Sequence, residues 1–395
     1  MDRRSFLKTT TAAAVSTAVM APPFLREARG ADPIKIGILL PFSKVMATLG
    51  GATEAGFLMG AKELGDKAGR PHVVIREDDG GDPAQGLSKA RKLIEKDNVD
   101  VIVGPVSSAV AASIRNYIVE SKKLWLNPIA TNDLLAEKGC SRYHFRFSAS
   151  GWQIAGPLGT WGKAKLGDRA YAIATNYAYG QQTLGHFKEA FQKAGGTFLG
   201  EAFAALGTTN YAPYFPPIKD AKPNFIFANF VGSDAAAFIK QYAEFGLKDI
   251  KIVGPVNLVS EDVLGAQGAA AVGVYSISYY TPSYDIPKNK AFVKAYKEYS
   301  GGKETDHFVC AGYDVAQAFF PAVGALKGDV ANTERLIAQI RDIKIDSPRG
   351  PFRFDPKTHN PIQDQHMRVV EANPLRHVVV DTVKEARHPD AGCQL

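Results

Sequence analysis

The chain has 395 residues, 45% of them hydrophobic, which is enough apolar material for two sizeable cores. The formal net charge is +7 at pH 7, but the charges are scattered singly, without the Lys/Arg runs or stripes that nucleic acids and anionic membranes require. The composition therefore predicts two globular units and excludes a nucleic-acid partner.

The N-terminus resembles an export signal of the twin-arginine type. Residues 1–8 contain paired arginines followed by Phe-Leu and Lys, and a weakly hydrophobic stretch follows over residues 9–21. This stretch is too short and too rich in Thr and Ala to span about 30 Å of hydrocarbon. We predict that residues 1–30 are a signal peptide, that cleavage falls near Gly30 or Ala31, and that the mature protein is periplasmic.

Strand and helix patterns then alternate through the first part of the chain. Apolar, β-branched runs predict strands, and runs with apolar residues on one face predict helices. The predicted strands are 34–40, 72–77, 101–103 and 124–127. The predicted helices are 51–64, 83–96 and 108–120.

The same alternation recurs from residue 151 onward. The predicted strands here are 170–175, 224–229 and 250–253, and the predicted helices are 181–194, 234–245, 287–299, 308–327 and 332–343. Short strand-like segments after residue 350, separated by Pro and Asn, predict antiparallel edge strands. The alternation implies right-handed βαβ units, so we predict an α/β fold with two Rossmann-like lobes built on parallel sheets.

The segments that follow the predicted strands point to a binding cleft. In parallel α/β sheets, ligands bind at the carboxyl ends of the strands, where helix N-termini present free N–H groups. These segments are rich in hydroxyls, amides, glycines and aromatics and poor in charge: 104–108, 128–133, 176–180, 230–233 and 254–257. Ser107 and Ser108 also suit ordinary helix N-caps, and Tyr177 and Tyr179 also suit core aromatics.

Several segments together resemble the leucine/isoleucine/valine-binding protein family of ABC importers, the type I periplasmic binding proteins. They are IKIGILLPFS (34–43), REDDGGDPAQG (76–86), DVIVGPVSS (100–108), PIATNDLL (128–135), YHFRFSAS (143–150), NYAYGQ (176–181) and AGYDVAQAF (311–319). The resemblance covers residues 33–381 and implies two lobes joined by three crossings, with the ligand cleft between them. It places residues 32–149 and 276–345 in lobe 1, residues 150–275 and 346–388 in lobe 2, and residues 389–395 in a tail.

The resemblance also implies which residues touch the ligand. It assigns Ser108, the backbone of Ile129, and Thr131 to the first lobe, where they hold a carboxylate. It assigns Tyr179 and the segments around Val231 and Val256 to the second lobe. With their neighbours, the candidate ligand-binding residues are Leu49, Ser107, Ser108, Ile129, Ala130, Thr131, Tyr179, Phe230, Val231, Val256 and Asn257.

One position departs from the pattern of the amino-acid binders. They carry an acidic residue just after a Gly-Pro pair, where it pairs with the ligand ammonium, and this chain has Val256 there. Leu49 stands where an aromatic side chain often covers the ligand. We therefore predict a small carboxylate-bearing solute, preferably an aromatic or hydrophobic acid. Branched-chain amino acids remain the alternative, because other groups in the sequence still offer an ammonium partner: Asn257, Glu261, Asp262 and Asp314.

Enzymatic motifs are absent from the sequence. The first strand leads into PFSK without a G-x-G-x-x-G turn, and neither H-E-x-x-H nor G-x-S-x-G occurs. We interpret His307 and His366 as surface or capping residues and expect no cofactor, metal or catalytic residue.

The expected protein is a monomer that closes on its ligand by hinge rotation and presents it to an ABC transporter permease in the inner membrane. A ligand sensor of the same fold remains an alternative.

The three cysteines allow one disulfide in an oxidising compartment. Their spacings match no metal-ligand pattern. Cys140 precedes the predicted strand YHFRF (143–147), and Cys393 lies in a tail with no hydrophobic pattern to hold it, so a disulfide between them would pin the tail. Cys310 lies in an apolar helical stretch, and we predict that it is a buried free thiol.

Overall fold

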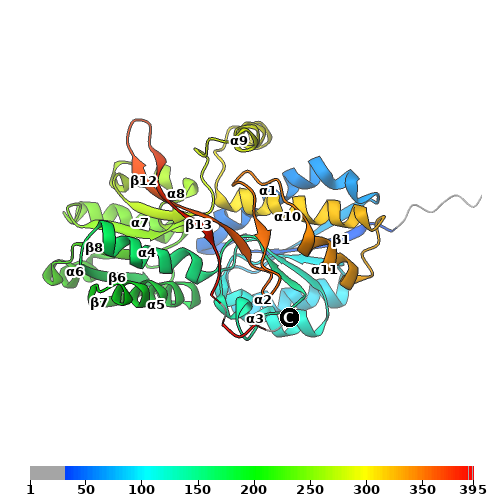
Figure 1. The fold of residues 1–395 in the computed structure, drawn as a ribbon, viewed down its shortest axis with the longest axis horizontal. Helices are drawn as coiled ribbons and strands as arrows, with labels where there is room; N and C mark the ends of the chain where they lie inside the picture. Colours follow the sequence, from blue (N-terminus) through cyan, green and yellow to red (C-terminus); the bar gives the residue numbers. More distant parts are fainter. Residues whose placement is uncertain (1–31, 390, 394) are drawn as a thin grey trace, which may run out of the picture. The chain divides into compact units, whose positions relative to one another are not determined.

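The computed structural model describes residues 32–389, 391–393 and 395. It contains two β-sheets with helices packed against them (Figure 1). The predicted signal peptide, residues 1–30, and its cleavage near Gly30 or Ala31 lie outside the described residues and stay predictions.

The first sheet has five parallel strands in the order β2-β1-β3-β4-β5. The strands are β1 Ile34–Leu40, β2 His72–Asp78, β3 Val101–Val103, β4 Leu124–Asn127 and β5 His144–Arg146. The helices that accompany this sheet are α1 Ala47–Leu64, α2 Pro83–Arg91, α3 Ser108–Glu120, α9 Pro287–Tyr299, α10 His307–Ala325 and α11 Thr333–Asp342. We call this sheet with its helices the first lobe.

Helices α1 and α10 of the first lobe approach each other through glycines. A Cβ atom added at Gly56 of α1 would lie 2.0 Å from the carbonyl oxygen of Val309, and one added at Gly312 of α10 would lie 2.1 Å from that of Thr53. Only glycine permits backbones to come this close. Helix α10 is long and apolar enough to cross a membrane, but 78% of its apolar window is buried in the molecule, as befits a core helix.

The second sheet carries parallel strands in the order β10-β9-β8-β6-β7, and β12 extends it in the antiparallel direction. The strands are β6 Arg169–Thr175, β7 Thr197–Ala204, β8 Phe225–Asn229, β9 Lys251–Pro255, β10 Tyr275–Ser278, β11 Arg353–Phe354, β12 Pro361–Glu371 and β13 Arg376–Ala386. The helices are α4 Gly151–Lys165, α5 Ala178–Lys193, α6 Phe215–Ala221, α7 Gly232–Glu244 and α8 Glu261–Gln267. We call this sheet with its helices the second lobe.

Short helical turns complete the secondary structure. They are Lys44–Met46, Gly65–Ala68, Lys92–Lys96, Asp133–Ala136, Ala212–Tyr214, Val256–Val259 and Gly268–Ala271. The predicted α/β class with two mainly parallel sheets is confirmed, as is the antiparallel character of the C-terminal strands. Strand β10 crosses the predicted lobe boundary between residues 275 and 276, because its whole length pairs with β9 and β12.

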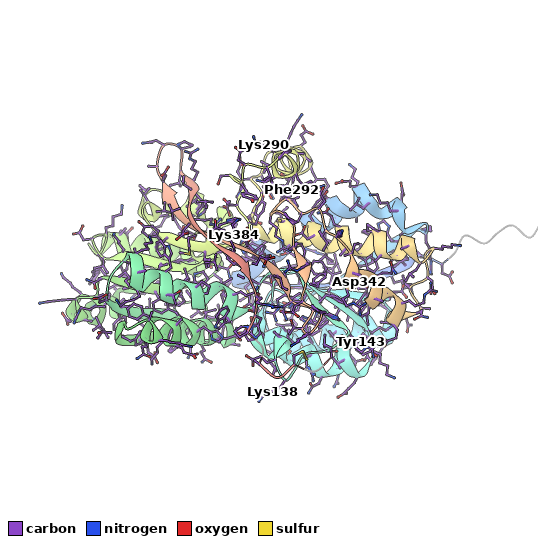
Figure 2. The ribbon with its side chains drawn as sticks, viewed as in Figure 1. Lys138, Tyr143, Lys290, Phe292, Asp342 and Lys384 are labelled. Atoms are coloured by element: carbon purple, nitrogen blue, oxygen red, sulfur yellow. A yellow bond between two sulfur atoms is a disulfide. The ribbon has the colours of Figure 1, made fainter. Side chains whose placement is uncertain are left out.

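The structure joins Cys140 to Cys393 in a disulfide, across 253 residues of sequence. Cys310 is free and buried in α10. Figure 2 shows Lys138, Lys290 and Lys384, all exposed, extending from three different segments.

Candidate functional site

Side chains from both lobes line one cavity at the carboxyl ends of the parallel strands. The lining residues are Met46, Leu49, Val106, Ser108, Ile129, Thr131, Tyr177, Tyr179, Val231 and Asn257. The space among them, including its open mouth, is about 280 Å³. The part of this space that a water-sized sphere can reach is only about 20 Å³. This is far below the roughly 300–1,000 Å³ of small-molecule pockets, so the lining side chains must move apart to admit a solute. None of these lining residues, all from the part of the chain that the structure describes, carries a charge.

The first-lobe end of the cavity presents two hydroxyl groups beside a helix N-terminus. Ser108 is the first residue of α3, and its Oγ lies 3.3 Å from Oγ1 of Thr131. Ser107 caps the helix, since its side chain accepts a hydrogen bond from the backbone N–H of Val110. Free N–H groups at a helix N-terminus, together with hydroxyl donors, favour an anionic group such as a carboxylate.

The second-lobe end of the cavity is built from aromatic hydroxyls and one amide. Tyr177 and Tyr179 flank the start of α5 with ring centroids 6.0 Å apart. Asn257 is the second residue of the helical turn Val256–Val259 that follows β9, and its Nδ2 donates to the Tyr179 hydroxyl at 3.2 Å. Burial raises the pKa of both tyrosines, so their hydroxyl groups are neutral and remain hydrogen-bond donors. This end also offers no anion.

The structure brings most of the predicted site residues together. Those that line the cavity are Leu49, Ser108, Ile129, Thr131, Tyr179, Val231 and Asn257. Met46, Val106 and Tyr177 line it as well and were not among the candidates. Val106 and Tyr177 lie in strand-end segments that had been singled out, whereas Met46 belongs to a short helical turn without a sequence signal.

Four candidates lie beside the cavity without lining it. Ser107 serves as the cap of α3, and Ala130 is fully buried in the core of the first lobe. Phe230 packs on Phe238, with ring centroids 4.5 Å apart, in the core of the second lobe. Val256 is buried next to Asn257. Val256 and Asn257 begin the helical turn Val256–Val259, where successive side chains point in different directions, and only the side chain of Asn257 lines the cavity.

The acidic residues that we had kept as partners for a ligand ammonium do not line the cavity. Glu261 pairs with Arg368 at 3.3 Å and with His377 at 3.0 Å. Burial alone would raise the pKa of Glu261, but the interactions with His377 and Arg368 outweigh burial and lower it to about 2. Asp314 pairs with Arg349 at 3.1 Å.

Asp262 is likewise engaged outside the cavity. It accepts hydrogen bonds from Ser260 and, at 3.5 Å, from Thr48 of the first lobe. A ligand ammonium in this cavity would therefore meet only hydroxyls and one amide.

The interpretation of His307 and His366 as surface or capping residues is wrong. Both are buried, with exposed fractions of 2% and 3%. His366 Nδ1 bonds the Thr382 hydroxyl at 3.1 Å in the β12–β13 ribbon. His307 is the first residue of α10, and its Nε2 lies 2.9 Å from Oδ1 of Asn257, which belongs to the cavity.

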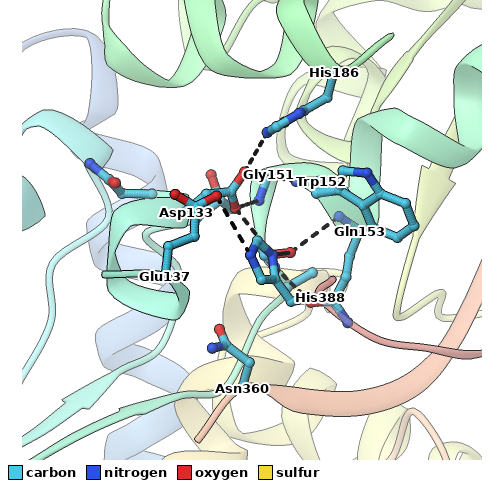
Figure 3. Close-up of polar contacts among 12 residues, drawn as sticks. Asp133, Glu137, Gly151, Trp152, Gln153, His186, Asn360 and His388 are labelled. Carbon is cyan, nitrogen blue, oxygen red and sulfur yellow. Dashed lines mark hydrogen bonds and ion pairs between the residues drawn. The ribbon is translucent and has the colours of Figure 1, made fainter. Parts of the chain in front are cut away.

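A second polar cluster joins the lobes around Asp133 (Figure 3). Asp133 accepts hydrogen bonds from the backbone N–H groups of Gly151, at 2.8 Å, and Trp152, at 3.2 Å, where α4 begins. His186 of α5 places Nε2 2.5 Å from the same carboxylate, and His388 places Nδ1 3.7 Å from it. Both lobes and the C-terminal segment therefore meet at one carboxylate.

A larger cavity lies elsewhere, mostly in the second lobe, and its space including the open mouth is about 880 Å³, against about 280 Å³ for the first cavity. It is lined by Glu261, Leu264, Gly265, Thr281, Pro282, Ser283, Glu304, Leu375, Arg376 and His377. It contains none of the strand-end residues, so we place the site in the smaller cavity. Within the described ranges, no three His, Cys, Asp or Glu side chains are grouped to hold a metal ion.

Comparison with known proteins places the chain in a family. Residues 33–376 match the family model described as periplasmic binding protein. A relative from Brucella suis, Leu/Ile/Val-binding protein homolog 6, is 28% identical over 347 residues, which cover 86% of this chain and 88% of that protein.

Solved structures agree with this assignment. An ABC transporter substrate-binding protein from Sphaerobacter thermophilus is 31% identical, with a TM-score of 0.84 over 91% of this chain and 100% of that one. A solute-binding protein of an ABC transporter from R. palustris, in complex with benzoate, is 30% identical, with a TM-score of 0.88 over 92% of this chain and 100% of that one. The chain therefore belongs to the leucine/isoleucine/valine-binding family of type I periplasmic binding proteins, which are solute-binding proteins of ABC transporters and not enzymes.

Proposed function

We propose that this protein binds a small carboxylate without an α-ammonium group, such as an aromatic or short hydrophobic acid, and delivers it to an ABC transporter permease. The observation that carries the proposal is the chemistry of the cavity: hydroxyl and amide donors lie at both ends, and no charged residue is among its described lining. A carboxylate gains hydrogen bonds at the N-terminus of α3. An ammonium would lose its hydration without meeting an anion, which costs several kcal/mol.

The walls of the cavity fit the apolar part of such a ligand. Met46, Leu49, Val106 and Val231 supply aliphatic or thioether surface, and Tyr177 supplies an aromatic face. Relatives of known structure support this ligand class: the R. palustris protein named above was solved with benzoate, and one from strain BisB5, 29% identical, with 3,4-dihydroxybenzoic acid.

The proposed mechanism is closure of the two lobes over the ligand by hinge rotation. The ligand would first bind Ser108 and Thr131 and gain the second-lobe contacts on closure, so the differential contact energy favours the closed form. The permease would recognise the closed monomer. The export signal predicted at residues 1–30 would deliver the protein to the periplasm.

Calorimetric titration of the purified protein tests the proposed ligand class. Leucine, its 2-oxo-acid analogue and benzoate are compared at one pH and one salt concentration. We expect heat from at least one of the two acids and none from leucine. Micromolar binding of leucine with no response to either acid would contradict the proposal and favour a branched-chain amino-acid binder.

A further inference from the structure

Three hydrogen-bonding side chains form a series that starts in the cavity and ends in the other lobe. Asn257 Nδ2 donates to the Tyr179 hydroxyl at 3.2 Å, and His307 Nε2 lies 2.9 Å from Asn257 Oδ1. Tyr179 and Asn257 belong to the second lobe, whereas His307 begins α10, which packs against α1 of the first lobe. The series therefore crosses between the lobes beside the cavity.

The surroundings of His307 determine which ring nitrogen carries the proton. The ring is buried against Phe308, with centroids 3.8 Å apart, and its Nδ1 has no hydrogen-bond partner among the described residues. Burial lowers the pKa of His307 to about 3, so the ring is neutral and holds one proton. A buried N–H without an acceptor is rarer and more costly than an unpaired acceptor, so the proton lies on Nε2.

This tautomer of His307 fixes the orientation of the Asn257 amide and, through it, of the Tyr179 hydroxyl. The Nε2–H of His307 donates to Asn257 Oδ1, so the amide of Asn257 must turn its Nδ2 toward Tyr179. The Tyr179 oxygen then accepts a hydrogen bond, and its own hydrogen is directed elsewhere.

We propose that His307 is a specificity-determining residue that acts through Asn257 to fix the Tyr179 hydroxyl as a hydrogen-bond donor toward the ligand. The site thereby selects carboxylates that carry an acceptor oxygen at the end facing the second lobe over carboxylates that carry an amine there. This inference rests on the proposed function, since the carboxylate is the group that Ser108 and Thr131 hold. A site built around a fixed donor discriminates strongly against a ligand that cannot accept.

Two ligands of similar size and equal charge test the inference. 4-Formylbenzoate presents an acceptor opposite its carboxylate, and 4-aminobenzoate presents chiefly a donor. The measured quantity is the ratio of their dissociation constants, determined by calorimetry for the wild type and each variant. We expect the wild type to prefer the formyl compound by roughly tenfold, the size of one well-placed hydrogen bond.

Two substitutions should change this ratio in different ways. His307→Phe keeps a ring beside Phe308 but removes the donor, so the Asn257 amide is free to turn and the preference should fall by roughly fivefold to tenfold. Asn257→Asp offers an oxygen to both His307 and Tyr179 and turns the donor away from the ligand, so the preference should reverse. His366→Phe, a second buried histidine replaced outside the cavity, is the matched control and should leave the ratio unchanged.

The outcomes separate this inference from the proposed function. If the wild type binds leucine and no benzoate, both fail. The role of His307 is refuted, while the proposed ligand class stands, if the wild type binds benzoate but has equal affinity for 4-formylbenzoate and 4-aminobenzoate. The same conclusion follows if His307→Phe and Asn257→Asp keep the wild-type ratio of these two affinities. Thermal unfolding of each variant shows that the protein titrated is folded.

Discussion

Ser108 and Thr131 are the residues on which carboxylate binding should depend most directly. Their hydroxyl oxygens are 3.3 Å apart, and both side chains are nearly buried. Removing either hydroxyl leaves part of the ligand carboxylate unpaired, so Ser108→Ala or Thr131→Ala should weaken binding of benzoate by about 1–3 kcal/mol. Calorimetric titration measures the loss. Ser113→Ala, which removes a hydroxyl from the same helix outside the cavity, should bind as the wild type does, and equal affinity in all three variants would exclude Ser108 and Thr131 from the site.

Asp79 provides a pH test of a single residue in the fold. Its side chain is fully buried, Oδ1 accepts from the Gly81 N–H at 2.8 Å, and Oδ2 has no partner among the described residues. Burial raises the pKa of Asp79 to about 7, so the folded state holds this proton more tightly than the unfolded state does. Between about pH 4 and pH 7 the free energy of unfolding should therefore fall as pH rises, by at most about 1.4 kcal/mol per pH unit.

The substitution Asp79→Asn should remove this contribution. The variant should gain stability over the wild type as pH rises from 5 to 8, and thermal unfolding at both values measures the gain. Asp78→Asn is the control: burial raises the pKa of Asp78, but backbone N–H donors outweigh burial and lower it, so Asp78 is ionised from pH 5 to pH 8 and its substitution should change stability equally at both values. Parallel pH profiles for the wild type and Asp79→Asn would show that Asp79 is ionised in the folded protein.

Helices and strands with a clear apolar pattern could be predicted from the sequence, whereas those with a mixed pattern of apolar and turn-forming residues could not. Strands β1, β3 and β4 have the predicted bounds because every face of them is buried between helices. Helix α4 escaped prediction because it contains Gly156, Pro157 and Gly159, which ordinarily mark turns. Strands β7 and β10 were also missed, since half-exposed or short alternating segments give a weak signal.

The site was predictable in position but not in its full membership. The carboxyl ends of parallel strands must meet at one edge of a sheet, so the strand-end segments identified the cavity. Which of two neighbouring residues faces the cavity depends on the course of the backbone. For this reason Val231 and Asn257 line the cavity, whereas Phe230 and Val256 are buried beside it. His307 reaches the site only through the packing of α10, which local sequence does not reveal.

The contact between His186 of α5 and Asp133 of the helical turn Asp133–Ala136 should make closure depend on pH. Burial lowers the pKa of His186, but the hydrogen bond and charge of Asp133 outweigh burial and raise it. The stability that this pair gives the folded protein is complete below about pH 6.5, the pKa of His186 in the unfolded chain. It is lost as pH rises through the higher pKa of His186 in the folded protein. Because Asp133 and His186 join the two lobes, affinity for benzoate should fall between pH 6 and pH 9. In His186→Gln the fall should be smaller, and an unchanged profile would show that the pair does not contribute to closure.

At the scale of the whole molecule, the disulfide ties the C-terminal segment to the first lobe. Cys140 and Cys393 are 253 residues apart in sequence, and the segment just before Cys393 carries His388, whose Nδ1 lies 3.0 Å from the Ser150 hydroxyl at the start of α4. A cross-link that closes so long a loop removes much conformational freedom from the unfolded chain.

Cys393→Ser should therefore lower the free energy of unfolding by about 2–4 kcal/mol, and a reductant should lower the melting temperature of the wild type but not of this variant. Cys310 cannot account for such a response, because it is buried and unpaired in α10. Mass spectrometry of unreduced peptides from the exported protein provides the direct test. Free thiols at both Cys140 and Cys393 would show that the tail is held by His388 and its neighbours alone, and the wild type should then melt at the same temperature with and without reductant.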